Sequence, residues 1–412
     1  MKLKLFVLIL SLFAAAYVYA GGPFSVDYLN DTGVALQWKD KNLQWWSDDS
    51  NLSDGGIIVD NTKAKQWVSD AMNLWTTAFL HDATRTPVQT VSVAATYKGS
   101  IGKDVNGSNF SEYTSSTPGE TVIIFDKDGM ITKSIAGENY KYIPGLSEIL
   151  LADSTGTKIL KGVVIFNGTL LTDKTLTEAE YKSAILHEVG HLFNLDHTQV
   201  NLDIAAGCDL GGTCEGSTYI PTMFPELKTA MQGEALKIDD KVTISWIYPN
   251  STLNSSFCTI KGEIHDRDGR PLQGVNVIAR RVGDGDTIMK ADSRSMVSGV
   301  MYPACYSDGH YYLYGIVPGK TYEVFYEPLS AEYTGMSGFE PLGNPPTDFE
   351  KGNIPSADGA TTVSCAAGGE TIEMQTVQVD VDNPCAPGDG GEVVDTGKSG
   401  GCSIITKIKN KR

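Results

Sequence analysis

Apolar side chains in the first 250 residues recur with two different periods. Over residues 61–80 they return at helical spacing, which predicts an amphipathic helix with Asn61 or Thr62 as its N-cap. Elsewhere they alternate with polar residues or form short continuous runs, and both patterns are typical of strands. The strands predicted in this way cover residues 33–38, 43–46, 88–93, 121–125 and 162–166.

Two further helices are predicted later in the same part of the chain. The first begins near Thr177, because Thr177 and Glu180 form an S/T-x-x-E capping box ahead of an apolar stripe. The second covers residues 236–248 and carries Asp239 and Asp240 in its first turn, where the helix dipole favours acidic side chains. Together with the strands, these helices predict an α+β domain.

The pattern changes to all-β after a polar stretch at residues 251–257. That stretch is rich in Asn and Ser and predicts a linker. Beyond it, short apolar segments are separated by turn residues, which is typical of a small β-sandwich over residues 258–380. Its predicted strands cover residues 259–264, 274–279, 311–314 and 322–326, with a turn at 266–269.

The first twenty residues have the organisation of a secretory signal peptide. Lys2 and Lys4 precede an apolar run at 5–18, and a small residue, Ala20, stands before the expected cut. A membrane anchor is the alternative, but this run is shorter than the roughly 20 residues that span a bilayer. We therefore expect a secreted protein, extracellular or periplasmic, with no stable membrane insertion once residues 1–20 are removed.

Charge narrows the classes of partner. The net charge of −17 argues against nucleic acid and anionic membrane surfaces as partners, because both repel an acidic protein.

At the C-terminal end of the chain, residues 381–412 are rich in Gly and Asp and predict a disordered tail.

Seven cysteines are present, and export would permit disulfides. Cys208 and Cys214 lie in a Gly-rich loop, where a short local disulfide would stiffen the chain. The pairing of the other cysteines is left open. No C-x₂-C pair occurs, which argues against a zinc-binding cysteine cluster.

The candidate chemistry is concentrated in residues 187–197, which read HEVGHLFNLDH. His187 and His191 are one helical turn apart on one face, so both imidazoles can bind one metal ion with Glu188 beside its open position. His197 can join them only if the chain turns back after the helix. Asn194 stands where that turn is needed, and Asn tolerates the left-handed conformation.

A chance occurrence on an ordinary amphipathic helix is the alternative explanation of an H-E-x-x-H motif. It would have to account for three of the six histidines of the chain falling within these eleven residues. The clustering favours a metal site.

These residues resemble the metzincin metalloprotease pattern, H-E-x-x-H-x-x-G-x-x-H followed by a Met-turn. Asn194 stands where that pattern has Gly. Met223 is the Met-turn candidate, and Pro225 two residues later is similar to the matrixin branch. Ala71 and Trp75 also match a matrixin helix, so that the resemblance covers residues 30–249. It implies a twisted mixed sheet with two long helices, the active-site helix and a C-terminal helix.

The resemblance implies a zinc-dependent metalloendopeptidase acting on a protein or peptide. Its Zn²⁺ ligands would be His187, His191 and His197, with Glu188 as the general base. Met223 would support the site from below without binding the metal. No cysteine-bearing propeptide follows the signal peptide, so latency by a cysteine switch is not expected. The rival interpretation is a non-catalytic adhesin with a structural zinc, which has no need for Glu188.

Two secondary interpretations concern other parts of the chain. Residues 126–129, Asp-Lys-Asp-Gly, match a fragment of a calcium loop, so Ca²⁺ is a second candidate cofactor beside the simpler interpretation as a turn. Residues 258–330 resemble a carboxypeptidase regulatory-like domain, a transthyretin-like β-sandwich. That resemblance implies a stability or binding module with no second active site.

Overall fold

The computed structural model describes residues 21–27, 33–208, 214–283, 290–300, 308–330 and 346–384. The predicted signal peptide and residues 385–412 of the predicted tail lie outside these ranges. No helix within them is both long and apolar enough to cross a bilayer.

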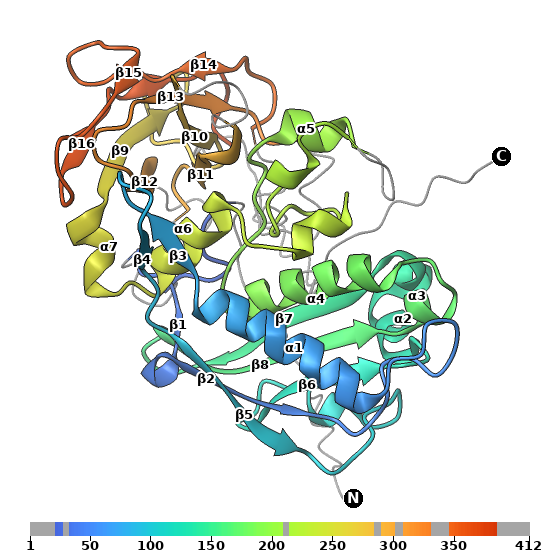
Figure 1. The fold of residues 1–412 in the computed structure, drawn as a ribbon. Coiled ribbons are helices and arrows are strands. Elements are labelled where there is room, and N and C mark those ends of the chain that lie inside the picture. Colours follow the sequence, from blue (N-terminus) through green and yellow to red (C-terminus); the bar gives the residue numbers. More distant parts are fainter. Residues whose placement is uncertain are drawn as a thin grey trace, which may run out of the picture.

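A six-stranded mixed sheet forms the base of the first half of the molecule (Figure 1). The order β1-β8-β6-β2-β5 is parallel throughout, and β7 joins β8 antiparallel. These strands are β1 (Gln37–Trp38), β2 (Asn42–Ser47), β5 (Ala94–Ser100), β6 (Thr121–Asp126), β7 (Gly145–Ala152) and β8 (Lys158–Asn167).

The central strands are continuously apolar because the sheet is covered on both faces. In β6 and β8, Ile123 and Val164 contribute to the core beneath the long helices, whereas their neighbours Val122 and Val163 contribute to a second core. Successive side chains of a strand point to opposite faces, so both sets must be apolar. This explains the predicted runs at 121–125 and 162–166.

Two long helices cross one face of this sheet side by side (Figure 1). They are α1 (Asn61–Thr76) and α4 (Glu178–Leu192). The capping box of α4 is present as predicted, with Thr177 Oγ1 accepting from the N–H of Glu180 and the Glu180 carboxylate accepting from the N–H of Thr177. The remaining helices are α2 (Met130–Ala136), α3 (Thr169–Thr172), α5 (Leu202–Ala206), α6 (Ile238–Ile247) and α7 (Ser251–Ser256).

Three predictions for local structure were wrong. The N-cap of α1 is Asp60, whose carboxylate accepts from the N–H of Lys63 at 2.8 Å, and the helix ends at Thr76 instead of continuing to residue 80. Of the predicted strand at 88–93, only residues 88 and 89 are in a strand, β4 (Pro87–Gln89), which pairs with β3 (Phe79–His81). Val91 forms an isolated bridge with Pro249, and β5 begins only at Ala94. The polar stretch predicted as a linker contains a short helix, α7, whose N-cap is Asn250.

A separate core lies beyond residue 257, and two small sheets build it. Their orders are β11-β10-β13-β14, with β15 on β13, and β12-β9-β16, with β17 on β9. The strands are β9 (Cys258–His265), β10 (Asn276–Arg281), β11 (Ser293–Val297), β12 (His310–Ile316), β13 (Tyr322–Glu327), β14 (Gly352–Asn353), β15 (Thr362–Val363), β16 (Thr371–Glu373) and β17 (Val377–Gln378).

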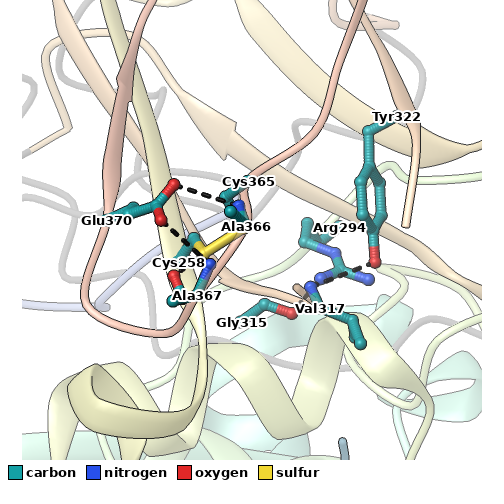
Figure 2. Close-up of a disulfide and its surroundings, with 9 residues drawn as sticks. All are labelled: Cys258, Arg294, Gly315, Val317, Tyr322, Cys365, Ala366, Ala367 and Glu370. Atoms are coloured by element: carbon teal, nitrogen blue, oxygen red, sulfur yellow. Dashed lines mark hydrogen bonds between the residues drawn. A yellow bond between two sulfur atoms is a disulfide. The ribbon is translucent and has the colours of Figure 1, made fainter. Parts of the chain in front are cut away.

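A disulfide joins the beginning of this second unit to its later part. It links Cys258 at the start of β9 with Cys365, 107 residues away (Figure 2). Beside it, the Glu370 carboxylate accepts hydrogen bonds from the N–H groups of Ala366 and Ala367 at 3.1 and 2.9 Å. The bridge and the carboxylate together fix the turn that leads into β16.

The two units are in direct contact through α6 and the segment after α4. The Asp239 carboxylate of α6 accepts from the N–H of Ser295 in β11 at 2.6 Å. The hydroxyl groups of Thr198 and Ser295 lie 3.0 Å apart. The chain is therefore an α+β protein with several sheets, and its β-rich unit packs close to the predicted metal ligands.

Candidate metal centre

The three predicted ligands meet at one point. His187 and His191 project from the last two turns of α4, and their Nε2 atoms are 2.9 Å apart. The Nε2 atom of His197 lies 3.1 Å from that of His187 and 3.2 Å from that of His191. Within the described ranges this is the cluster of histidine, cysteine or acidic side chains that could hold a metal ion.

The chain turns back to His197 through the backbone of Asn194. Its φ is 72°, the left-handed conformation that the sequence predicts at this position. The turn closes with hydrogen bonds from the N–H of Asn194 to His191 O at 2.8 Å and from the N–H of Leu195 to Gly190 O at 3.1 Å. This C-terminal cap of α4 explains how a ligand six residues after His191 returns to the same site.

Hydrogen bonds on the far side of two rings fix their tautomers. Nδ1 of His187 donates to Thr222 O at 2.7 Å, and Nδ1 of His191 donates to Leu195 O at 2.8 Å. Each Nδ1 therefore carries the proton, and each Nε2 presents a lone pair to the other rings.

Burial keeps all three imidazoles neutral. It lowers the pKa of His187 to about 4. Burial, together with the neighbouring imidazoles, also lowers the pKa values of His191 and His197 well below the usual range. The Nε2 lone pairs of His187 and His191, 2.9 Å apart, repel one another unless a cation lies between them. Ligand atoms at about 2.0–2.1 Å from a tetrahedral zinc would be about 3.3 Å apart, so the residues fit such an ion.

Glu188 is buried beside this cluster, where a glycine makes room for it. A Cβ atom at Gly145 of β7 would lie 2.5 Å from Cγ of Glu188 and 3.3 Å from its Oε1. Contacts that short do not occur, so only glycine lets the antiparallel edge strand approach the side chain. The sequence gives no signal for Gly145, because the contact joins residues far apart in the chain.

Met223 packs against the backbone of α4 between the two helical ligands. A Cβ atom at Gly190 would lie 2.4 Å from Sδ of Met223 and 2.8 Å from the ring of Trp75. Trp75 in turn donates from Nε1 to Leu186 O at 2.9 Å. Gly190 therefore allows the buried methionine and the tryptophan to approach the ligand helix together.

Asp240 holds the segment around Met223 in place, a role that the sequence did not indicate. Its carboxylate accepts from the N–H of Thr222 at 2.9 Å, of Met223 at 3.0 Å and of Lys237 at 2.8 Å. The carbonyl of Thr222 accepts the hydrogen bond from Nδ1 of His187. Asp240 thus fixes the segment that orients the first ligand.

Two other predicted features lie outside this centre. A disulfide joins Cys208 and Cys214, whose Cα atoms are 5.4 Å apart. The Asp126 carboxylate accepts from the N–H groups of Ile131 and Thr132 in the first turn of α2, at 3.2 and 2.8 Å. These bonds describe a turn before a helix, and residues 126–129 are not part of the metal-ligand cluster found in the described ranges.

A cavity of about 340 Å³ lies between the β3–β4 hairpin and the β-sandwich. None of the predicted site residues lines it. The candidate chemistry of this chain therefore rests on the histidine cluster and not on that cavity.

The sequence matches no family model and no curated protein. Among solved structures, the C-terminal fragment of the pilus adhesin SpaC from Lactobacillus rhamnosus GG is 12% identical over 31% of this chain and 46% of that one, with a TM-score of 0.17. The dioxygenase domain of a dioxygenase–carbohydrate-binding fusion from Streptomyces sp. SirexAA-E is 16% identical over 32% of this chain and 84% of that one, with a TM-score of 0.16. The chain spans less than half of the first structure, and TM-scores this low establish no shared fold.

Proposed function

We propose that this chain is a secreted zinc-dependent metalloendopeptidase with a metzincin-type, matrixin-like catalytic domain over residues 21–250. The observation that carries the proposal is the convergence of three buried Nε2 atoms within 3.2 Å of one another, with Glu188 buried next to the first of them. Neutral imidazoles in this arrangement are suited to bind a divalent metal ion and to leave one of its positions open.

The architecture around the cluster agrees with this proposal. A mixed sheet with one antiparallel strand lies beneath α1 and α4, and α6 closes the domain. The methionine expected below the metal packs on α4 at Gly190. The resemblance implies a mixed sheet, helices over it and a methionine beside the ligand helix, so these features support the proposal.

In the proposed reaction the residues have separate roles. His187, His191 and His197 would hold the ion. A zinc ion in such a site acidifies water and polarises a peptide carbonyl. Glu188 accepts the proton of the attacking water and then donates it to the leaving amine. The hydrogen bonds on Nδ1 keep His187 and His191 in the tautomer that can bind the metal.

The location and the second domain belong to the same proposal. Export directed by residues 1–20 is compatible with the two disulfides, which form in oxidising compartments. Residues 258–380 would serve as a carboxypeptidase regulatory-like module that adds stability or a binding surface. The resemblance implies no second active site in this module, and the histidine cluster and Glu188 all precede it.

The test is proteolysis of an unfolded protein by the purified full chain, together with elemental analysis. We expect about one equivalent of zinc, cleavage at internal bonds, loss of cleavage with a chelator and its return when zinc is restored. A fully metal-loaded protein that cleaves nothing would contradict the enzymatic proposal and favour a structural zinc site. A protein that binds no metal would overturn the proposal altogether.

A further inference from the structure

Asn194 has a feature that the turn itself does not require. Its left-handed backbone is the reason why glycine suits this position, and glycine would adopt φ near 72° without strain. The asparagine side chain is completely buried, so its amide group needs hydrogen-bond partners inside the protein. Its hydrogen-bond partners therefore show what asparagine contributes here that glycine would not.

The Asn194 amide binds the backbone of two distant segments. Its Oδ1 accepts from the N–H of Ser25 at 2.6 Å, and its Nδ2 donates to Ser25 O at 2.9 Å. The same Nδ2 donates to Leu36 O at 2.8 Å. The amide thus pairs with Ser25 as a neighbouring peptide group would, and it uses both of its amide donors.

The segment held in this way, residues 21–27, is called the strap below. It runs antiparallel to the turn that carries the third ligand, with a bridge between Pro23 and Leu195. The N–H of Phe24 donates to Asn194 O at 2.7 Å, and Gly22 O accepts from the N–H of Asp196 at 3.0 Å. The N–H of the first strap residue also donates to the carbonyl of His197 itself.

The strap is packed on its other side as well. Gly21 O accepts from the N–H of Val297 in β11 at 3.2 Å, and a Cβ atom at Gly22 would lie 3.0 Å from Val300. The ring of Phe24 is buried and its centre lies 5.8 Å from that of His191. The strap therefore lies between the ligand turn and the β-sandwich, and it covers one ligand with an apolar ring.

We propose that Asn194 is a positioning residue for the metal centre, which fixes His197 by holding the strap as a strand beside the ligand turn. Without the strap, the turn keeps the bond from His191 Nδ1 to Leu195 O and the bond from the N–H of Thr198 to Met223 O. Both join it to the side of α4 and the Met-turn. The strap supplies the hydrogen bonds on the opposite side.

This inference rests on the proposed zinc-dependent function, and its test measures metal affinity directly. Asn194→Gly keeps the backbone conformation and removes three side-chain hydrogen bonds. Loss of an outer partner of a metal ligand typically weakens binding by about 10–100-fold, and we expect the zinc affinity of the full chain to fall by that factor. A chelator competition gives the affinity, and the visible spectrum of the Co²⁺-loaded protein reports whether three imidazoles still bind.

Asn201→Gly is the matched control. Asn201 is also buried and left-handed, with φ 60°, and its side chain also makes three hydrogen bonds, to Tyr219 O, Lys290 O and the Arg280 guanidinium. None of its bonds reaches the strap. We expect a comparable loss of thermal stability in both variants, but an unchanged zinc affinity and Co²⁺ spectrum in Asn201→Gly.

A second pair of variants changes Ser25 in the strap. It replaces the first test if Asn194→Gly does not fold. Ser25→Pro removes the N–H that Oδ1 of Asn194 accepts, and Ser25→Ala keeps it. We expect weaker zinc binding only in Ser25→Pro. Wild-type affinity in a folded Asn194→Gly or Ser25→Pro protein would overturn this inference and leave the proposed function intact. Absence of metal from the wild-type chain would overturn both.

Discussion

The histidines of the two units show how differently the same residue type can be used. In the first unit, His187, His191 and His197 are buried and turn their Nε2 atoms toward one another. In the β-sandwich, His265 and His310 are partly exposed, and the Nε2 atom of each lies 3.0 Å from a carboxylate oxygen of Glu263.

The difference lies in where each imidazole places its proton. The carbonyls of Thr222 and Leu195 accept hydrogen bonds from Nδ1 of His187 and His191, which leaves the Nε2 lone pairs of these two rings for a metal ion. Around Glu263 the carboxylate accepts from Nε2, so these nitrogens are donors and have no lone pair for a metal. A metal site therefore depends on acceptors behind the rings as much as on the spacing of the rings.

The largest expected effect separates these two groups of histidines. His197→Ala should lose most of the bound zinc and reduce proteolysis to the level of the chelated protein, because two imidazoles hold the ion much more weakly than three. His310→Ala should retain about one equivalent and full activity. Elemental analysis and a peptide assay on both variants check this. Equal zinc content in the two proteins would refute the assignment of His197 as the third ligand.

The next effect distinguishes chemistry from metal binding within the first unit. Glu188→Gln should slow turnover by about 10²–10⁴-fold, the usual contribution of a general base, and should keep its zinc and its melting temperature. Gln has the shape of Glu and still fits against Gly145. Near-normal turnover with full zinc would exclude Glu188 as the base. Loss of zinc would mean that Glu188 supports the ligands and leave the base unassigned.

A smaller effect compares glycines that are equally crowded in the two units. A Cβ atom would lie 2.4 Å from Met223 Sδ at Gly190 and 2.5 Å from the hydroxyl of Tyr311 at Gly262. Overpacking of this kind costs about 1–3 kcal/mol, so both alanine variants should unfold more easily. Only Gly190→Ala should also bind zinc more weakly, because it displaces the helix that carries two ligands. Denaturation gives the stability of each variant, and chelator competition gives its zinc affinity. An equal loss of zinc affinity in both variants would contradict this prediction.

The smallest effect is a pH dependence at the contact between the two units. Burial raises the pKa of Asp239 to about 7 in the folded protein, whereas the unfolded value is near 3.8. Between these values the folded state binds the proton more tightly, so this residue adds stability as the pH falls from 7 toward 4 and costs stability above 7.

Asp239→Asn isolates that contribution, since the buried histidines act in the opposite sense. Their lowered pKa values make the unfolded state bind more protons below about 6.5, which destabilises the fold in acid. The difference in unfolding free energy between wild type and Asp239→Asn should change by roughly 2–4 kcal/mol between pH 7 and 4, in favour of the wild type at low pH. Parallel pH profiles would mean that Asp239 is not protonated in the folded protein over this range.

Much of the ligand helix could be predicted from local sequence. Thr177 and Glu180 are three residues apart and cap α4 as expected, and His187 and His191 fall on one face because the helix repeats every 3.6 residues. The left-handed turn at Asn194 follows from the need to return to the site. Local prediction was less successful at residues 77–93, where the hairpin of β3 and β4 replaces the predicted end of a helix and most of a predicted strand.

The sequence by itself determined the three candidate ligands, the glutamate beside them and the change from mixed to all-β pattern, because these depend on neighbours within a few turns of the chain. Only the tertiary structure decided what surrounds them. Asn194 binds Ser25, 169 residues away, and Asp239 binds Ser295, 56 residues away. No periodicity or capping rule links such pairs, since their contact depends on how the strap, the sheet and the β-sandwich pack together. The support of the metal centre is therefore a property of the folded chain, whereas its ligands are a property of one helix and one turn.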